Sequence, residues 1–351
     1  MLKPMIANRI VPLVVGCSLA AATDAVAQTD IPATMLHDGQ TRSFIVRLPP
    51  GFSADASHPL VLALHPALSS GASFQSSSGW DAVSDLHGVV VVYPTGGVPV
   101  GAQGGFAWNS WAFGGEAPDD LGFLAALIAA MHASYGTDPC RTSMTGFSNG
   151  AMMTNSFVAV HADKVAAIAP VSGGWITAYG GSEAELTPAH PVPVWTWRGS
   201  NETFVTGVGK NARPRNQQDQ EQLAFWVSHN AASLVTTVSE QLTYGFPRTY
   251  LTSIHAGDAP VWFTEVQGTG HLYQPGAADL IWNRFFSQIK QGAGDCLRCP
   301  TDFNGDGATD GADLGMLLGA WGASHESIDL DGDGVVAGAD LGLLLAAWGP
   351  C

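Results

Sequence analysis

Short apolar runs alternate with longer stretches of helical periodicity along most of the chain. Seven runs have the length and β-branched content of strands, and they lie at 41–48, 60–64, 89–93, 141–145, 165–171, 192–197 and 261–265. Four stretches between them have helical length, at 120–135, 149–161, 217–230 and 275–291. This alternation predicts an α/β fold whose mostly parallel sheet carries helices on both faces. In such sheets the chemistry lies at the carboxyl ends of the strands.

Length and composition fit one large domain with a small second one. The chain has 351 residues, of which 46% are hydrophobic and 13% charged, which favours a well-packed core over disorder. Its formal net charge of −16 makes nucleic acid and anionic membrane surfaces poor partners, because both attract patches rich in Lys and Arg. The charge is uneven, since residues 300–351 contain nine acids and neither Lys nor Arg.

The N-terminal residues predict export. Basic residues precede an apolar stretch at 10–22 that is too short for a comfortable membrane span, and small residues that favour cleavage end at Ala27. We therefore expect residues 1–27 to be a signal peptide and the mature protein to be secreted. The alternative is a lipoprotein box that ends at Cys17, which would make Cys17 a lipidated N-terminus.

Four cysteines remain after such a cleavage, and an even number in an exported protein suggests two disulfide bonds. The four are Cys140, Cys296, Cys299 and Cys351. We favour Cys140 with Cys296 and Cys299 with Cys351, while the sequence alone leaves all three pairings open.

The stretch GFSNGAMM at 146–153 contains a G-x-S-x-G pattern centred on Ser148. A predicted strand precedes it and a predicted helix follows it, which is the setting of a nucleophile elbow. Gly146 and Gly150 would let the strand and the helix pack closely around a strained serine. The alternative is a glycine-rich connection between strand and helix without a chemical role.

A serine hydroxyl becomes a good nucleophile only when a neighbouring base removes its proton. His271 stands in the loop GTGHLYQPG, after the predicted strand at 261–265 and before the last helix. Glu202 is the only carboxylate in RGSNETF, the loop after the preceding strand, where it could orient the histidine. We therefore expect Ser148, His271 and Glu202 to form a triad. The alternatives are a loop histidine with local hydrogen bonds, and a solvated glutamate replaced by an Asp from elsewhere.

The oxyanion of an acyl-transfer intermediate needs two backbone N–H donors. Asn149, directly after the candidate nucleophile, is expected to supply one of them. The loop HPALSSG, which begins at His65, is expected to supply the other. Because Pro66 has no N–H, the donor is Ala67, with Leu68 as the alternative. His65 is expected to be a structural hydrogen-bonding group under this loop rather than a base.

Seven segments carry a resemblance to a known family. In chain order they are PLVLALHP, GVVVVYP, FAWNSW, DDLGFLAALI, TGFSNGAMM, AAIAPVSG and GTGHLYQPG, and together they cover roughly 38–290. The ordered set resembles the α/β-hydrolase family of polyhydroxybutyrate depolymerase-like, feruloyl and acetylxylan esterases. This resemblance implies the α/β-hydrolase fold and a secreted serine esterase, with Ser148 as nucleophile and His271 as base.

Two departures from the family pattern fall beside the expected active site. The family usually has His-Gly where this chain has His65-Pro66, and His-Gly-x-x-Asp where it has RGSNE at 198–202. The oxyanion loop and the orienting acid are therefore the altered parts of an otherwise ordered set of serine, acid and histidine.

Trp108, Asn109 and Trp111 are candidates for the substrate cleft, where aromatic rings could stack on a phenolic acid or a sugar. The alternative for these residues is packing in the core. No cofactor motif lies in this region of the sequence, and acyl transfer through serine needs none.

Residues 302–322 return at 329–349 as a repeat with an offset of 27 residues. Each copy has oxygen ligands at positions 1, 3, 5 and 12 of a calcium loop, and glycine at position 6, where the loop turns sharply. The ligands are Asp302, Asn304, Asp306 and Asp313 in the first copy, with Asp310 at position 9, and Asp329, Asp331, Asp333 and Asp340 in the second. These carboxylates would repel one another without a cation, so we expect two structural Ca²⁺ ions in a small all-α module. The alternative is an acidic disordered tail.

The repeat resembles a type I dockerin, which consists of two half EF-hands with Asp at position 12 and one helix after each loop. The resemblance covers about 300–351 and implies docking onto a cohesin partner. Cellulosomal dockerins often carry Ser/Thr pairs at positions 10 and 11, where this chain has Gly311-Ala312 and Gly338-Ala339. Attachment to the cell surface and simple stabilisation are therefore the alternatives.

These features predict a hydrolase domain at 28–290, a linker at 291–299 and the calcium module at 300–351. We expect a secreted serine ester hydrolase. The presence of the module favours feruloyl or acetyl esters of plant polysaccharide as substrates. This inference is an analogy from the module and does not rest on the chemistry of the site. The alternatives are a polyhydroxyalkanoate depolymerase and, in another class, a non-catalytic carbohydrate-binding or scaffold-attached protein.

Overall fold

The computed structural model describes most of the chain from Thr29 onward. The described residues are 29–54, 56–102, 104–110, 118–174, 187–203, 215–289, 301–304, 308–325 and 328–350. The expected signal peptide, Cys17 and the linker at 291–299 lie outside these ranges. What the sequence indicates for those segments therefore stays a prediction.

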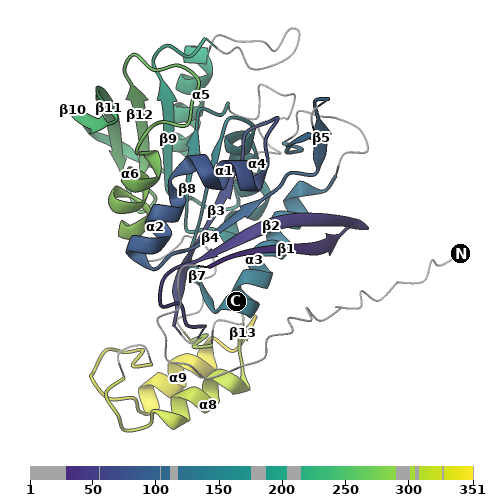
Figure 1. Cartoon of the computed structure of the whole chain (residues 1–351). Coiled ribbons are helices and arrows are strands. Elements are labelled where there is room, and N and C mark those ends of the chain that lie inside the picture. The colour runs from purple at the N-terminus through teal and green to yellow at the C-terminus, as the bar shows by residue number, and fades with distance from the viewer. Residues whose placement is uncertain are drawn as a thin grey trace, which may run out of the picture.

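The described residues form a ten-stranded sheet with the order β1-β2-β4-β3-β7-β8-β9-β12-β11-β10 (Figure 1). Its six inner strands run parallel, and they are β4 (Val90–Pro94), β3 (His58–Leu64), β7 (Thr137–Phe147), β8 (Ala167–Val171), β9 (Val194–Gly199) and β12 (Val261–Val266). Antiparallel hairpins form both edges, and they are β1 (Thr29–His37) with β2 (Gln40–Leu48) and β10 (Ser233–Tyr244) with β11 (Phe246–Ala256). The mostly parallel central sheet that the sequence predicts is therefore confirmed.

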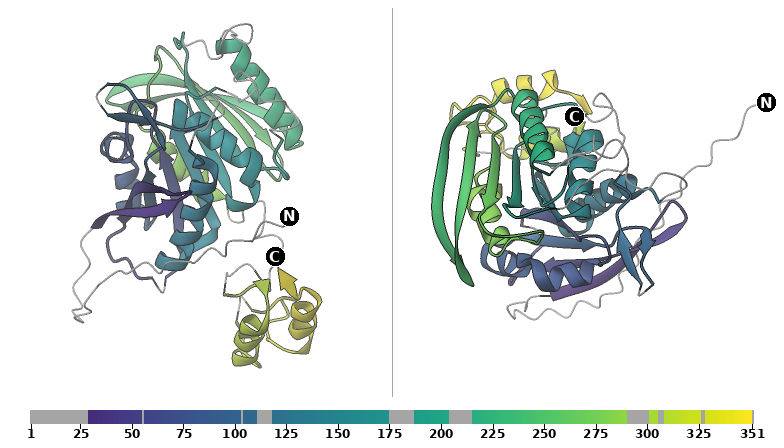
Figure 2. Two further views of the ribbon diagram at one scale, coloured as in Figure 1. Left: turned by 90° about the vertical axis from the view of Figure 1, so that its right-hand side faces the viewer. Right: turned by 90° about the horizontal axis from the view of Figure 1, so that it is seen from above.

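Helices cover both faces of this sheet (Figure 2). One face carries α3 (Asp120–Tyr135), α4 (Asn149–His161) and α5 (Arg215–His229). The other face carries α1 (Gly71–Ser78), α2 (Trp80–His87) and α6 (Ala277–Arg284). Each inner strand serves both apolar clusters, because successive side chains of a strand point to opposite faces. In β3, for example, Leu62 belongs to one cluster, whereas its neighbours Val61 and Ala63 belong to the other.

Two predicted helices match the observed bounds, because their apolar pattern runs between clear ends. α3 is capped by Asp119, whose carboxylate accepts the Gly122 N–H at 2.8 Å, and it ends at Gly136 in the left-handed conformation. α4 starts directly after Ser148. The helix expected at 275–291 is shorter, since α6 ends at Arg284 and a 3-10 turn follows at Phe286–Gln288.

Several elements at the edges of the fold have no apolar periodicity and are not predicted by the sequence. α1 reads GASFQSSS and is capped by Ser70, whose hydroxyl accepts the Ser73 N–H at 3.3 Å. β10 is exposed along most of its length, so its sequence has no buried face to mark it as a strand. A local cap stabilises α1, and pairing with β11 stabilises β10. Neither feature appears in the sequence as an apolar pattern.

The C-terminal repeat forms a small helical unit with its own core. Its helices are α8 (Gly311–Gly319) and α9 (Gly338–Ala346). Leu317 and Leu344 are buried in this core together with Ile328 and Val336. The two-residue strands β13 (Ala308–Thr309) and β14 (Gly349–Pro350) pair antiparallel and join the first loop to the end of the chain. One helix follows each loop, as the repeat predicts.

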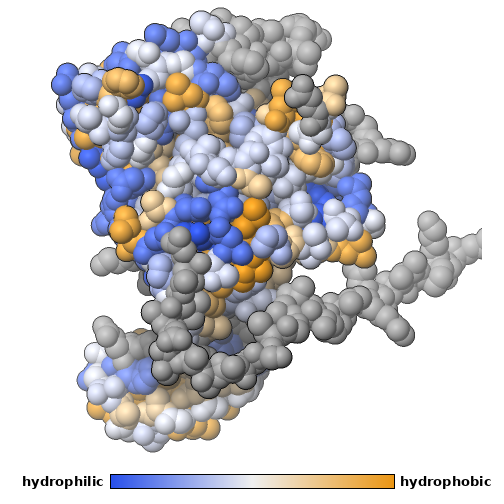
Figure 3. Space-filling model, viewed as in Figure 1, coloured by the Kyte–Doolittle hydropathy of each residue, from blue (hydrophilic) through white to orange (hydrophobic). Residues whose placement is uncertain are grey.

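The surface shown in Figure 3 mixes hydrophilic residues with small, separate hydrophobic patches. Within the described ranges, the helices are all too short or too polar to cross a membrane. Leu68 is one of the exposed apolar side chains, with 70% of its surface accessible. It lies in the loop after β3, at the carboxyl end of a parallel strand.

Candidate active site

Ser148 stands on the sharp turn between β7 and α4. Its φ of 54° and ψ of −113° are unfavourable for a residue other than glycine, and its N–H donates to the Val171 carbonyl at 3.0 Å. A Cβ at Gly146 would lie 2.4 Å from the Gly150 backbone, and one at Gly150 would lie 2.3 Å from the Leu64 carbonyl oxygen. Only glycine fits at both positions, so this turn has the geometry of a nucleophile elbow.

His271 and Glu202 lie beside Ser148 at the same edge of the sheet. His271 Nε2 is 2.9 Å from Ser148 Oγ, and His271 Nδ1 is 3.4 Å from Glu202 Oε2. The three residues follow β7, β9 and β12, so the carboxyl ends of three parallel strands supply the three groups. The structure thus brings the three predicted triad residues together, at distances that permit proton transfer from the serine to the histidine.

The Glu202 side chain is completely enclosed, with none of its surface exposed to solvent. Its Oε1 accepts the Gly199 N–H at 3.0 Å and the Ser172 hydroxyl. The loop of the acid is also joined to the loop of the base, because the Asn201 N–H donates to the Thr269 carbonyl at 2.8 Å. One oxygen of the glutamate therefore faces the base, while the backbone and a serine hold the other.

Aromatic rings pack around the base. Phe147 lies against the His271 imidazole with ring centroids 5.0 Å apart, and Tyr273 contacts Phe147 edge-on at 6.1 Å. The Tyr273 hydroxyl accepts the Trp80 indole N–H at 2.8 Å, and burial raises the pKa of Tyr273 to about 12. The sequence predicts no role for Phe147 or Tyr273, although each is close in sequence to a predicted triad residue.

His65 is buried beneath the loop after β3. The Gly96 N–H donates to its Nε2 at 2.9 Å, so its proton is on Nδ1, which donates to the Pro66 carbonyl at 2.7 Å. Burial lowers the pKa of His65 to about 4, which keeps the ring neutral at ordinary pH. The structural role expected for His65 is therefore confirmed, and Pro66 contributes to it through its carbonyl.

The two expected oxyanion donors lie on elements that are in contact. Asn149 is the first residue of α4, where backbone N–H groups have no partner within the helix. A Cβ at Gly150 would lie 2.7 Å from the His65 carbonyl oxygen, so the loop that carries Ala67 begins against this helix end. Within the described residues, the Ala67 N–H has no hydrogen-bond partner. Both backbone groups are therefore available as donors.

The rest of this loop is fixed by a small hairpin, which consists of β5 (Val98–Val100) and β6 (Gly105–Ala107). The Phe106 N–H donates to the Ser69 carbonyl at 2.9 Å. A Cβ at Gly105 would lie 2.7 Å from the Leu68 backbone, so the hairpin packs tightly against the loop. Leu68 itself has a φ of 62°, which is a strained value for a leucine.

The residues expected to line the substrate cleft differ in their placement. Trp108 is fully buried, and its indole N–H donates to the His65 carbonyl at 2.9 Å, so it packs in the core and supports the oxyanion loop instead of facing a substrate. Its backbone N–H donates to the Asn149 side chain at 2.6 Å. Asn109 is half-buried, and its side-chain amide donates to a backbone carbonyl of the same loop at 3.0 Å. Trp111 lies outside the described residues.

A buried ion pair holds the segment that carries Trp108. Arg42 pairs with Asp120, and both side chains are almost inaccessible to solvent. The carboxylate also accepts the N–H groups of Gly97 at 3.0 Å and Asn109 at 2.7 Å. Burial raises the pKa of Asp120 although the arginine favours its charged form. The sequence gives no sign of this ion pair, because its two residues are 78 positions apart in the chain.

Arg198 stands where the esterase family that the sequence resembles usually has a histidine. Its guanidinium pairs with Asp219 of α5 and with Glu265 of β12. The arginine therefore ties β9 to a neighbouring helix and a neighbouring strand, one residue before the turn that leads to Glu202.

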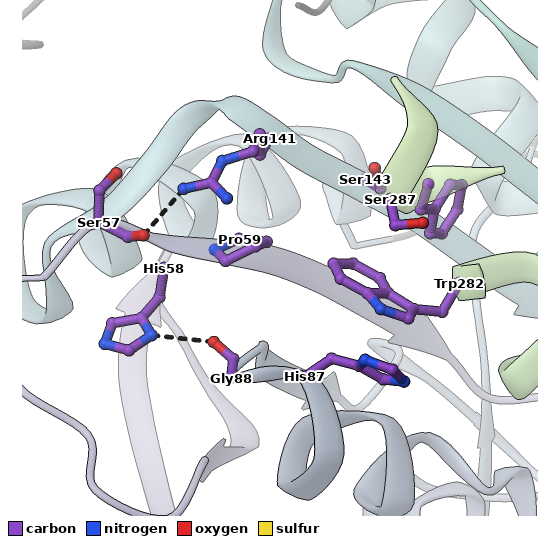
Figure 4. Close-up of a pocket in the computed structure, with 10 residues that line it drawn as sticks. Ser57, His58, Pro59, His87, Gly88, Arg141, Ser143, Trp282 and Ser287 are labelled. Atoms are coloured by element: carbon purple, nitrogen blue, oxygen red, sulfur yellow. Dashed lines mark hydrogen bonds between the residues drawn. The ribbon is translucent and has the colours of Figure 1, made fainter. Parts of the chain in front are cut away.

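A separate hollow of about 320 Å³ lies at the amino ends of β3 and β4, away from Ser148 (Figure 4). His58, Arg141 and Trp282 are among the residues that line it. Arg141 donates to the Ser57 carbonyl at 2.8 Å, and His58 Nδ1 is 2.9 Å from the Gly88 carbonyl. These polar groups thus already serve the fold, and the hollow lies at the end of the sheet opposite to the triad.

The second loop of the C-terminal repeat, which we also call the tail, brings three of its expected calcium ligands together. Asp329, Asp331 and Asp333 place carboxylate oxygens within 4.8 Å of one another. Asp340 is not part of this group, because its carboxylate accepts the N–H groups of Ala337 at 2.6 Å and Leu330 at 2.7 Å. These hydrogen bonds lower the pKa of Asp340 and keep it charged.

The first loop is described in part. Asp302, Asn304, Asp310 and Asp313 belong to the described residues, whereas Asp306 does not. Asp313 repeats the role of Asp340, since it is buried and accepts the Phe303 N–H at 2.7 Å. Asp310 caps α8 by accepting the Ala312 N–H at 2.7 Å, which is a structural role in addition to the ligand role expected from its position.

Cys140 is disulfide-bonded. The other cysteines of the chain lie outside the described residues. The pairing of Cys140 with Cys296, and of Cys299 with Cys351, therefore stays a prediction.

A solved structure has the same arrangement of sheet and helices. The acetyl xylan esterase from Aspergillus awamori matches this chain with a TM-score of 0.55 at 19% identity, over 74% of this chain and 99% of that one. The chain has the α/β-hydrolase fold. Its nucleophile elbow and its Ser–Glu–His order along the chain are the features that this fold uses for catalysis.

Curated proteins with similar sequences are esterases and a polyester depolymerase. A bifunctional acetylxylan esterase/xylanase from Neocallimastix patriciarum is 28% identical over 232 residues, which are 66% of this chain and 31% of the relative. Feruloyl esterase B from Piromyces equi is 31% identical over 175 residues, or 47% of this chain and 30% of the relative. Poly(3-hydroxyalkanoate) depolymerase C from Paucimonas lemoignei is 32% identical over 127 residues, or 36% of this chain and 30% of the relative.

The aligned part is only a portion of each protein, and the chain spans about a third of the length of these curated relatives. No protein-family model matches the chain. The comparisons thus relate this α/β-hydrolase to ester-cleaving enzymes, and its own substrate has to be argued from the site.

Proposed function

We propose that this α/β-hydrolase is a serine carboxylic-ester hydrolase. The observation that carries the proposal is the series of contacts from Ser148 through His271 to Glu202, with distances of 2.9 and 3.4 Å. The serine stands on a strained turn, and the acid is fully enclosed. Similarity to acetylxylan and feruloyl esterases supports the same class of reaction.

The reaction follows from the chemistry of these groups. Ser148 Oγ attacks the ester carbonyl carbon while His271 Nε2 takes the hydroxyl proton, and Glu202 stabilises the imidazolium. The N–H groups of Asn149 and Ala67 bind the negative charge that develops on the carbonyl oxygen. His271 then gives its proton to the leaving alcohol, which leaves the acyl group on the serine. Water, deprotonated by His271, releases the carboxylic acid and restores the enzyme.

Acetyl or feruloyl esters of plant polysaccharides are the substrates we favour. The esterase relatives support this choice, and so does the C-terminal repeat, because its resemblance to a dockerin associates the chain with polysaccharide degradation. A polyhydroxyalkanoate is the second candidate, because one relative with 32% identity is a depolymerase of such polyesters. Both substrate classes are cleaved by the same acyl-enzyme chemistry.

Hydrolysis of p-nitrophenyl acetate by wild type and Ser148→Ala tests the reaction class. We expect the variant to lose activity by about 10⁴-fold or more, and a serine-directed phosphonate to label only the wild type. Activity that survives in Ser148→Ala would contradict the assignment. A wild type without any hydrolysis would instead favour a carbohydrate-binding or scaffold-attached protein.

A comparison of three polymers tests the substrate class. Release of acetate from acetylated xylan, of ferulate from feruloylated xylan and of hydroxybutyrate from a polyhydroxybutyrate film is measured with wild type and Ser148→Ala. We expect Ser148-dependent release from one or both xylans. Release from the polyester alone would replace the favoured substrate class with the second candidate.

We also propose that the C-terminal repeat binds Ca²⁺ and serves attachment. The close carboxylates of Asp329, Asp331 and Asp333 fit a hard cation that prefers oxygen ligands. The attachment partner is a cohesin-like domain or a cell-surface component. Export of the protein is part of the proposal, and the disulfide bond at Cys140 supports it, because such bonds persist mainly in oxidising compartments.

A further inference from the structure

Ser172 lies directly behind the orienting acid but takes no part in the steps of ester hydrolysis. It follows β8, and it is almost completely buried, with 1% of its surface exposed. Its φ is 54°, which is strained for a serine. Such strain persists only where the surrounding structure fixes the residue, and it is concentrated at functional sites.

The backbone around Ser172 is fixed from two sides. Its N–H donates to the Trp197 carbonyl of β9 at 2.8 Å. A Cβ at Gly173 would lie 2.3 Å from Ala151 Cβ, so the chain leaves this turn tightly against the first part of α4. The preceding carbonyl, that of Val171, accepts the N–H of the nucleophile. The turn therefore has a set position relative to both the nucleophile and the acid.

The Ser172 hydroxyl donates a hydrogen bond to the carboxylate of Glu202. Ser172 Oγ makes a close hydrogen bond to Glu202 Oε1, whereas the alternative acceptor, the Leu272 carbonyl, is 3.4 Å away. Glu202 Oε1 also accepts the Gly199 N–H at 3.0 Å, so two donors meet on this oxygen. The other oxygen, Oε2, is left to face Nδ1 of the base at 3.4 Å.

A glutamate needs more support here than an aspartate would. Its side chain has one more rotatable bond, so its carboxylate can turn away from the histidine more easily. We propose that Ser172 is a positioning residue, which holds Glu202 Oε1 so that Oε2 stays aligned with His271. This inference rests on the proposed ester hydrolysis, and it makes the site a series of four side chains from Ser172 to Ser148.

Two substitutions at Ser172 separate the hydroxyl from the backbone strain. Ser172→Ala keeps the strained conformation and removes the hydroxyl, whereas Ser172→Gly removes the hydroxyl and fits a φ of 54° without strain. We expect kcat for p-nitrophenyl acetate to fall by about 10- to 100-fold in both variants, the usual effect of losing a hydrogen bond to a charged group, with KM within about threefold of wild type. Unchanged kcat in the folded glycine variant overturns the proposal.

Ser156→Ala is the matched control. Ser156 is also a completely buried serine, and its hydroxyl donates to the Met152 carbonyl within α4 at 3.0 Å. We expect this variant to keep kcat within about twofold of wild type, because its hydroxyl bonds only to its own helix. A loss as large as that of Ser172→Gly would show that any buried serine has this effect, and it would overturn the proposal.

A double-mutant cycle with Glu202→Gln tests whether Ser172 acts through the acid. Because the glutamine cannot stabilise the imidazolium, adding Ser172→Gly in this background should change kcat by less than about twofold. Equal losses in both backgrounds would mean that Ser172 acts independently of Glu202, contrary to the proposal.

The low-field proton NMR resonance of His271 Nδ1–H tests the same positioning without turnover. We expect the resonance in wild type and in Ser156→Ala, its loss in Glu202→Gln, and a clear upfield shift or loss in Ser172→Gly. An unchanged resonance in Ser172→Gly overturns the proposal. If wild type shows this resonance but no hydrolysis that depends on Ser148, the proposed function fails while the positioning role stands.

Discussion

Strained residues gather at the candidate active site. Five described residues other than glycine have positive φ values, and three of them, Leu68, Ser148 and Ser172, lie in the oxyanion loop, at the nucleophile and behind the acid, whereas Asp38 and Ala231 lie elsewhere. Each such conformation costs on the order of 1–3 kcal/mol. Close packing around these residues, together with the hydrogen bonds of the Ser148 and Ser172 N–H groups, offsets that cost. The site is therefore held in its working geometry before a substrate arrives.

His65 gives the stability of the protein a defined pH dependence. Burial lowers its pKa from 6.5 to about 4, so below pH 6.5 the unfolded chain binds a proton that the folded protein does not. The contribution of His65 to stability is therefore complete above about pH 6.5 and falls as the pH drops towards 4. We expect a loss of about 2 kcal/mol between pH 7 and pH 5 from this group.

Urea unfolding of wild type and His65→Asn at pH 7 and pH 5 measures this effect. The variant is less stable at pH 7, but it should lose less stability than wild type over the interval, because asparagine does not titrate. Parallel losses in the two proteins would show that other groups cause the acid sensitivity.

Single residues of the site differ in how well the sequence predicts them. Ser148, Glu202 and His271 could be predicted because each follows a recognisable strand, and strand ends of a parallel sheet meet at one edge. Ser172 could not, because its contact with Glu202 depends on the turn after β8 and joins residues 30 positions apart. For Trp108 the sequence left open both a place in the cleft and packing in the core, since an aromatic residue in a loop gives no sign of its burial, and the structure shows it fully buried.

At the scale of elements, close contact between β3, β7 and α4 sets the angle of the elbow. Gly150→Ala should disturb it, because the added Cβ would lie 2.3 Å from the Leu64 carbonyl oxygen. We expect a loss of about 1–3 kcal/mol in unfolding free energy and a lower kcat. Gly315→Ala in α8 is the control, since a Cβ there meets nothing within 4 Å and should raise stability slightly. Equal effects of the two substitutions would contradict this account.

Whether a strand can be predicted from the sequence depends on how much of it is buried. The inner strands could be predicted because they are covered on both faces and read as continuous apolar runs, as in β4. β10 and β11 could not, because one face or both stay exposed and their pairing supplies most of their order. The sequence therefore predicts the parallel centre that carries the triad and also β2 of one edge hairpin, and it misses β1, β10 and β11.

At the scale of the whole molecule, the tail has its own apolar core, separate from the two clusters that surround the large sheet. If the tail binds calcium as proposed, removal of the ion should destabilise it, because the close carboxylates of Asp329, Asp331 and Asp333 would then repel one another. We expect calorimetry of the full chain to show a tail transition that moves to lower temperature with a chelator, while hydrolysis of a small ester stays unchanged.

Two variants sharpen this experiment. Asp331→Asn combined with Asp333→Asn removes two charges from the described cluster and should abolish the shift caused by the chelator. Asp38→Asn, at an exposed turn between β1 and β2, is the control and should leave the shift intact. If the temperature of the tail transition in wild type does not change with the chelator, the calcium proposal is wrong.

The separation of Ser148 and His271 by 123 positions in the chain has a consequence for how the protein matures. Contacts between such distant positions form late, because a long loop must close first. A chain that folds from its N-terminus has its elbow in place while it still lacks a base, and it gains one only when β12 joins β9. We therefore expect partly folded molecules to have a serine that does not react. Recovery of hydrolysis during refolding should lag behind recovery of the helical signal. The appearance of activity would then report when β12 has paired with β9.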